Sequence, residues 1–133
     1  MNHNYSMKKI ILLTLISLPA FADVYQVPGN VQVWTSGTRQ YMQATMNVRF
    51  NTALAGAPYM LANGSVNSSV TFAGRDSNYV YFSCSVSTSS PFYAAAVDAK
   101  NNLTNGGRLY IYKQVGSSDC ESFSLGNYSY YQF

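Results

Sequence analysis

The chain has 133 residues, of which 47% are hydrophobic, 15% aromatic and 10% charged. Many aromatic and few charged side chains exclude an intrinsically disordered chain, and the length favours a single folded domain. The formal net charge of +3 is too small to indicate a nucleic-acid-binding protein, so no nucleic-acid partner is expected.

Residues 1–22 have the three parts of a secretory signal peptide of bacterial type. Lys8 and Lys9 form the positive start, residues 10–18 form an apolar run, and Ala20-Phe21-Ala22 is a small-x-small cleavage motif. The apolar run is shorter than the roughly 20 residues that span a bilayer, which disfavours the alternative of an uncleaved membrane anchor. We therefore expect cleavage after Ala22 and no transmembrane segment in the remaining residues, 23–133.

Alternation of apolar and polar side chains predicts β-strands along the rest of the chain, since successive side chains of a strand face opposite sides. Turn residues, mostly glycine and asparagine, separate these segments. The pattern predicts an all-β domain, an antiparallel β-sandwich or small barrel of about six to seven short strands. The candidate strands lie at Val31 and Val33, 44–50, Val70 and Phe72, 80–86, 108–112, Phe123 and Leu125, and in the tail 128–133.

One segment, 91–100, interrupts this alternation and predicts a short helix. Ser90 and Pro91 are typical of a helix start, and Lys100 suits the negative end of the helix dipole. At helical spacing, Phe92, Ala95, Ala96 and Ala99 share one face. A strand of small residues is the alternative.

Cys84 and Cys120 are the two cysteines of the chain, an even number in a sequence that carries an export signal. We expect them to form a disulfide, and two buried free thiols are the alternative. The bond would close a loop of about 37 residues and stabilise the fold by roughly 3–4 kcal/mol in the chain-entropy model.

Several catalytic chemistries have no residues to support them after position 22. The one histidine is His3, so Ser-His-Asp and Cys-His arrangements are not expected, and no cofactor-binding or metal-binding motif is present. Carboxylates remain the candidates for hydrolysis, and three of them, Asp76, Asp119 and Glu121, read as solvated surface. We expect no enzyme, no cofactor and no metal, and keep a carboxylate-dependent hydrolase using Asp76, Asp98, Asp119 or Glu121 as a minority alternative.

The tyrosines carry the strongest functional signal. Eleven of the twelve follow residue 22, and pairs spaced two apart share one face of a strand. If the strand that carries Tyr79 and Tyr81 lies beside the strand that carries Tyr110 and Tyr112, the four rings would form one aromatic face with Arg108 at its end. The candidate ligand-binding residues are Tyr79, Tyr81, Arg108, Tyr110 and Tyr112. Ordinary sheet packing is the competing interpretation, because tyrosine pairs also stabilise sheets.

These observations predict a small binding protein, secreted or, if it is not exported further, periplasmic. The first hypothesis is recognition of a glycan or a host or cell-surface ligand through a tyrosine-rich sheet face. The alternative is a protein–protein module such as an inhibitor, an adhesion component or a subunit of an extracellular assembly. The sequence leaves the ligand and the oligomeric state open.

Overall fold

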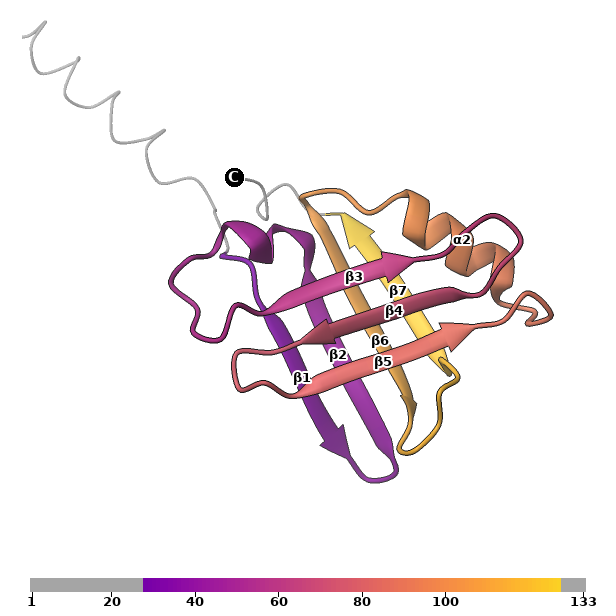
Figure 1. Ribbon diagram of the computed structural model, residues 1–133, viewed down its shortest axis with the longest axis horizontal. Coiled ribbons are helices and arrows are strands. Elements are labelled where there is room, and N and C mark those ends of the chain that lie inside the picture. The colour runs from indigo at the N-terminus through magenta and orange to yellow at the C-terminus, as the bar shows by residue number, and fades with distance from the viewer. Residues whose placement is uncertain (1–27, 128–133) are drawn as a thin grey trace, which may run out of the picture.

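The computed structural model describes residues 28–127, which form two antiparallel sheets and one short α-helix (Figure 1). The four-stranded sheet has the order β1-β2-β6-β7 and the three-stranded sheet the order β3-β4-β5. In chain order the elements are β1 (Val31–Ser36), β2 (Arg39–Thr45), the 3-10 helix η2 (Met46–Phe50), β3 (Tyr59–Asn63), β4 (Val70–Arg75), β5 (Tyr81–Val86), α2 (Tyr93–Asn101), β6 (Gly107–Gln114) and β7 (Ser122–Asn127).

The core lies between the two sheets, whose strands cross one another in projection with the three-stranded sheet in front (Figure 1). Each sheet contributes the apolar side of its alternating strands. Burial of a large apolar side chain stabilises a fold by about 1.5–3 kcal/mol, so this layer is the main source of stability. The five largest fully buried side chains are Phe72, Phe82, Met42, Leu109 and Ile111.

The alternation predicted for β6 is confirmed, and the alternation predicted over 80–86 is confirmed from Phe82 onward but wrong at Val80, which precedes β5 and is 43% exposed. In β6, Leu109 and Ile111 are fully buried, while Tyr110 and Tyr112, which alternate with them, are half-buried on the outer side. In β5, Phe82 and Cys84 point into the core in the same way. The prediction of a mainly β fold is therefore correct, and of the sandwich and the small barrel that the sequence left open, the structure has the two sheets of a sandwich.

The predicted strand over 44–50 is wrong beyond its first two residues. β2 ends at Thr45, whose amide donates to the carbonyl oxygen of Asn30 at 3.0 Å, and the chain then turns into η2. Within η2 the polar Asn47 is fully buried and Phe50 is exposed, which reverses the predicted sides. The sequence prediction also missed β3, where the apolar Leu61 faces outward and weakens the alternation.

The predicted helix is confirmed as α2, which begins at Tyr93 and ends at Asn101. Ala96 and Ala99 are buried, but Phe92 precedes the helix and is 54% exposed, and Ala95 is exposed. Two hydrogen bonds attach α2 to the β3–β4 connection: Tyr93 Oη donates to the carbonyl oxygen of Ser68 at 2.7 Å, and Lys100 Nζ donates to that of Gly64 at 3.1 Å.

The predicted disulfide between Cys84 and Cys120 is present, and it joins β5 to the β6–β7 connection. Backbone hydrogen bonds continue the link, since the Ser85 amide donates to the carbonyl oxygen of Ser118 at 2.8 Å. Side chains of the other sheet cover the rest of this edge: Lys113 Nζ donates to the carbonyl oxygen of Ser83 at 2.7 Å, and Gln40 Nε2 to that of Tyr81 at 3.1 Å. These contacts protect the β5 edge from pairing with another strand.

Two predictions lie outside the described residues: the signal peptide over 1–22 and the strand in the tail 128–133. Within residues 28–127, no helix is long and apolar enough to cross a membrane.

Candidate binding surface

Four aromatic side chains form a continuous surface on the outer face of the four-stranded sheet. We call it the ring surface, and it consists of Trp34 from β1, Tyr41 from β2, and Tyr110 and Tyr112 from β6. Strand register explains the grouping, because Tyr41 is paired with Trp34 on one side and with Tyr112 on the other. Side chains in such a row across a sheet lie on the same face and touch.

The rings contact one another from end to end. Trp34 and Tyr41 are stacked, with centroids 5.3 Å apart and planes 7° from parallel. Tyr110 lies 6.3 Å from Trp34 and 6.1 Å from Tyr41, and Tyr112 lies 5.4 Å from Tyr41. The packing fixes the ring orientations in advance of any ligand, and each such pair contributes about 0.5–1.5 kcal/mol. Trp34 is the most open of the four, with 38% of its surface exposed.

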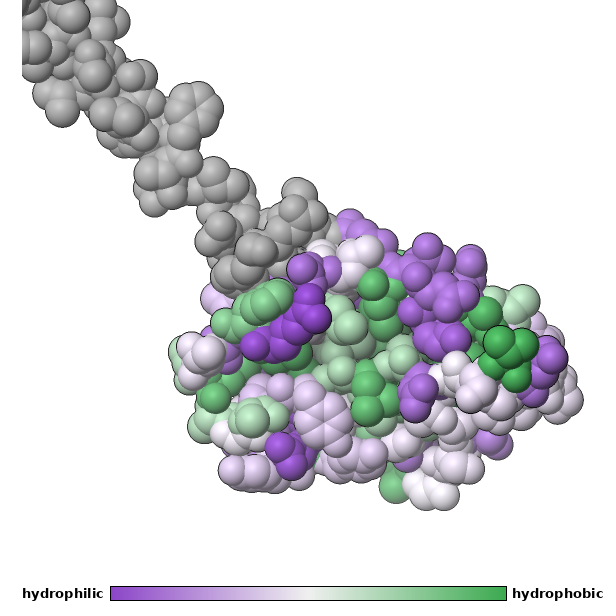
Figure 2. All heavy atoms as spheres, turned by 45° about the horizontal axis from the view of Figure 1, so that its top comes forward, coloured by the Kyte–Doolittle hydropathy of each residue, from purple (hydrophilic) through white to green (hydrophobic). Residues whose placement is uncertain are grey.

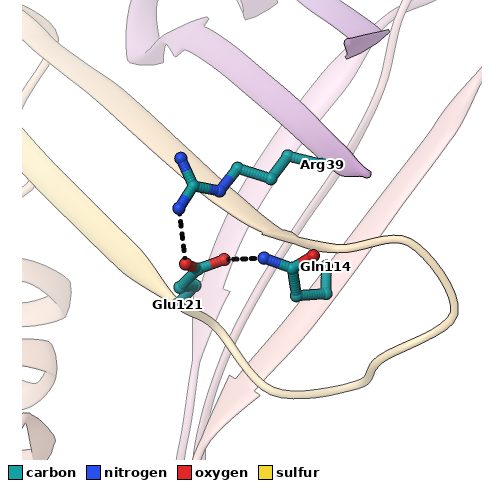
Figure 3. Close-up of polar contacts among 3 residues, drawn as sticks. All are labelled: Arg39, Gln114 and Glu121. Carbon is teal, nitrogen blue, oxygen red and sulfur yellow. Dashed lines mark hydrogen bonds and ion pairs between the residues drawn. The ribbon is translucent and has the colours of Figure 1, made fainter. Parts of the chain in front are cut away.

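One end of the ring surface is closed by an ion pair. Arg39 places its guanidinium 4.8 Å from the ring centroid of Tyr112 and donates through Nη2 to Glu121 Oε1 at 2.9 Å. Gln114 Nε2 donates to the other oxygen of Glu121 at 2.7 Å (Figure 3). Arg39 therefore presents a charge that Glu121 neutralises locally.

The hydrogen bond that Arg39 donates to Glu121 raises the pKa of Arg39 above its usual value, and Tyr41 and the charge of Glu121 add to the effect. Because the pKa of Arg39 is raised in the folded state, the stabilisation of the fold by the Arg39–Glu121 ion pair is fully present below the usual pKa of arginine. It is lost only as pH rises through the raised value. Arg39 thus stays charged throughout the physiological range.

Arg108 lies on the same outer face, two residues before Tyr110. It is half-buried and pairs in register with Thr45 of β2 and Gly126 of β7. The sequence hypothesis placed Arg108 at the end of the tyrosine face. The structure puts it on that side, at the opposite end of β6 from the Arg39–Glu121 ion pair.

Tyr79 and Tyr81 do not join Tyr110 and Tyr112, because β5 and β6 belong to different sheets. Nor do they share one strand face: Tyr79 lies in the β4–β5 turn and Tyr81 in β5, both beside Arg75 of the three-stranded sheet. The Arg75 guanidinium lies 5.2 Å from the ring centroid of Tyr79 and 5.3 Å from that of Tyr59. Tyr81 is the register partner of Arg75. The single aromatic face expected from the sequence is therefore two separate surfaces.

Sequence reasoning missed two members of the ring surface, Trp34 and Tyr41. Trp34 follows the inward Val33, so alternation alone could have placed it outward. Tyr41 lies before the segment in which the strand was predicted, and alternation around Met42 would have found it.

The carboxylates hold structural positions. Asp76 is buried, which corrects its expected place on the solvated surface, because its Oδ1 accepts hydrogen bonds from the amides of Asn78 and Val80, both at 2.9 Å. Asp98 and Asp119 are exposed, and Glu121 is half-buried in its ion pair. Nowhere in residues 28–127 do three histidine, cysteine or acidic side chains gather in a way that could hold a metal ion.

Fold and surface together define a disulfide-linked β-sandwich with an aromatic outer face. Comparison of the chain with protein-family models, with curated proteins and with solved structures finds no match.

Proposed function

We propose that this chain is a secreted bacterial binding protein that recognises a glycan through the ring surface. The observation that carries the proposal is the contiguity of Trp34, Tyr41, Tyr110 and Tyr112 on an outer sheet face. Aromatic rings offer flat apolar area against which the C–H face of a sugar packs, and the polar tips of Tyr and Trp can hydrogen-bond to its hydroxyl groups. Neighbouring strands lie about 4.8 Å apart, so a surface that crosses three strands is wide enough to contact more than one sugar unit.

The electrostatics of this face also favour an uncharged or weakly charged ligand. Arg39 is paired with Glu121, so the ring surface offers no strong positive patch at that end. Polyanions require a cluster of unpaired cations, whereas a glycan is bound mostly through stacking and neutral hydrogen bonds. Arg108, half-buried on the same face, is the residue that could contact a polar substituent of the ligand.

The Cys84–Cys120 disulfide supports the proposed export, since such bonds persist in oxidising compartments. With the signal-like segment 1–22, it is consistent with a protein that works outside the cell, or in the periplasm if it is not exported further.

A protein–protein module is the alternative use of the same residues, because tyrosine and tryptophan also anchor protein interfaces. Large continuous apolar patches usually mark such interfaces. Figure 2 shows a different face from the ring surface, and there hydrophobic residues stand in small groups between hydrophilic ones, so that face offers no such patch. A minority alternative is a hydrolase that uses carboxylates, for which one Asp→Asn change would abolish activity.

A glycan array tests the proposal with a pair of matched variants. Tyr41→Ala/Tyr110→Ala removes two rings of the ring surface, and Tyr59→Ala/Tyr81→Ala removes two tyrosines from the outer face of the other sheet. We expect the wild type and the Tyr59/Tyr81 variant to bind the same glycans. The Tyr41/Tyr110 variant should bind them about tenfold or more weakly, because two stacking contacts are lost.

A urea unfolding curve for each variant confirms that it is folded at the temperature of the array. A wild-type protein that binds no glycan, or a Tyr41/Tyr110 variant that binds as well as the wild type, would contradict the proposal. Concentration-dependent association in light scattering, abolished by the Tyr41/Tyr110 variant, would favour the protein–protein alternative.

A further inference from the structure

A groove runs along β1 beside the ring surface. One wall is the strand itself with residues 30–34, and the other is the β4–β5 turn, residues 76–78. Gln43 of β2 completes the lining, and the groove has a volume of about 610 Å³. This size lies within the range of about 300–1,000 Å³ that is usual for small-ligand sites.

The groove is continuous with the ring surface, because Trp34 belongs to both. The register places Gln32 of β1 opposite Gln43 of β2, in the row next to the Trp34–Tyr41 pair. Neighbouring positions on one face of a strand are about 6–7 Å apart. A ligand stacked on Trp34 would therefore reach Gln32 and Gln43 with its next unit.

The groove lining is polar but uncharged at its accessible positions. Among the described residues that line it, the one ionisable side chain is Asp76, which is 7% exposed and accepts two backbone hydrogen bonds within its own turn. The side-chain amides of Gln32, Gln43 and Asn78 make no hydrogen bond in the described part of the chain. Amides both donate and accept, which matches the hydroxyl groups of a sugar.

The turn that forms the outer wall is fixed by its own hydrogen bonds. The Asp76 amide donates to the carbonyl oxygen of Val80 at 3.0 Å, and the Tyr79 amide donates to that of Asp76 at 3.1 Å. The Asp76 carboxylate adds its two bonds to the amides of Asn78 and Val80. A wall ordered before binding reduces the conformational entropy that a ligand must overcome.

We propose that this groove is a second subsite, which binds an uncharged sugar unit joined to the unit stacked on Trp34. The inference rests on the proposed glycan-binding function and names its ligand class: a neutral oligosaccharide of at least two units. A sugar carboxylate has no partner among residues 28–127 here, because none of their cations lines the groove and the Asp76 carboxylate lies close by. Burying an unpaired charge costs more free energy than burying a neutral hydroxyl group.

Calorimetry on three proteins tests this subsite: the wild type, Gln32→Ala/Asn78→Ala in the groove, and the control Asn101→Ala. Asn101 is an exposed amide near the end of α2. The probes are galactose, lactose and a neutral tetrasaccharide of galactose and N-acetylglucosamine, each also with an added sugar carboxylate. The variants leave the ring surface intact and keep every backbone amide of the turn.

In the wild type and in Asn101→Ala we expect affinity to rise about tenfold or more from galactose to the tetrasaccharide. The neutral probes should bind more tightly than their acidic counterparts. In Gln32→Ala/Asn78→Ala we expect galactose to bind as in the wild type and the gain with length to be lost.

Glycan binding whose length dependence is the same in all three proteins would overturn the groove subsite and leave the proposed function standing. Tighter binding of the acidic probes would also overturn it. A wild type that binds no glycan on the array would overturn both proposals, and one that binds glycans on the array but none of these neutral probes would overturn the groove subsite alone.

Discussion

At the scale of single residues, Gly74 lies where the two sheets pack closely together. A Cβ atom at this position would overlap the sulfur of Met42 from the facing sheet and lie 2.9 Å from the carbonyl oxygen of Tyr59. Gly74→Ala should therefore lower the free energy of unfolding by about 1–3 kcal/mol, as overpacking of a dense core does. Urea denaturation measures the change.

The control for Gly74→Ala is Ser124→Ala, at an exposed outward position of β7. It should change the stability by less than about 0.5 kcal/mol, as is usual for surface positions. If Gly74→Ala is as stable as the wild type, the sheets can separate at this point without cost and the close packing described here is wrong.

Single residues also show where sequence reasoning stops. An aspartate in a turn is usually solvated, but Asp76 is buried because the turn folds two amides onto its carboxylate. Tyr79 adopts a positive φ of 64°, which a large side chain rarely takes, and its ring covers Arg75. Neither feature follows from local residue preference, since both depend on what the turn packs against.

At the scale of elements, the disulfide is a covalent cross-link between the two sheets, added to the connections of the main chain. Cys84 lies in β5 of the three-stranded sheet, and Cys120 lies in the β6–β7 connection of the other. Cys84→Ala/Cys120→Ala should lower the free energy of unfolding by about 4 kcal/mol, on the loop-entropy model for its sequence separation of 36. The measurement is urea denaturation under oxidising conditions.

Wild-type protein treated with a reducing agent is the matched control, and its stability should fall by a similar amount. If the double variant and the oxidised wild type unfold at the same urea concentration, the bond does not constrain the unfolded chain as described.

Elements with strong alternation were predictable, and those without it were not. In β6 the small and branched core positions alternate cleanly with tyrosine, so both the strand and its outward rings followed from the sequence. In 44–50 the same period occurs, but the chain leaves the sheet at Thr45 and buries Asn47 in η2. Alternation is a local signal, and the end of a strand is decided by what the neighbouring chain can pair with.

At the scale of the whole molecule, the sheet to which each strand belongs determines which aromatic residues touch one another. β5 and β6 are separated along the chain only by α2 and its connections, yet they enter different sheets. Tyr41 meets Tyr112 only because β2 pairs with β6, a segment far away along the chain. Residue pattern could identify outward tyrosines, but it held no information on strand order.

The whole fold also gives the protein two distinct aromatic surfaces on the outer faces of opposite sheets. The ring surface is continuous and borders a groove, while the tyrosines of the other sheet gather around Arg75. This difference is the reason for assigning ligand binding to the ring surface and using the other as its control.

The most direct test of glycan recognition is the intrinsic fluorescence of Trp34, the only tryptophan in the chain and a member of the ring surface. The protein is titrated with the glycan that gives the strongest signal on the array. The control is a saccharide of equal size that gives no signal on the array. We predict a saturable shift of the emission with the same dissociation constant as calorimetry gives. Binding that saturates in calorimetry while the Trp34 emission stays unchanged would contradict the account, since the ligand would then lie elsewhere.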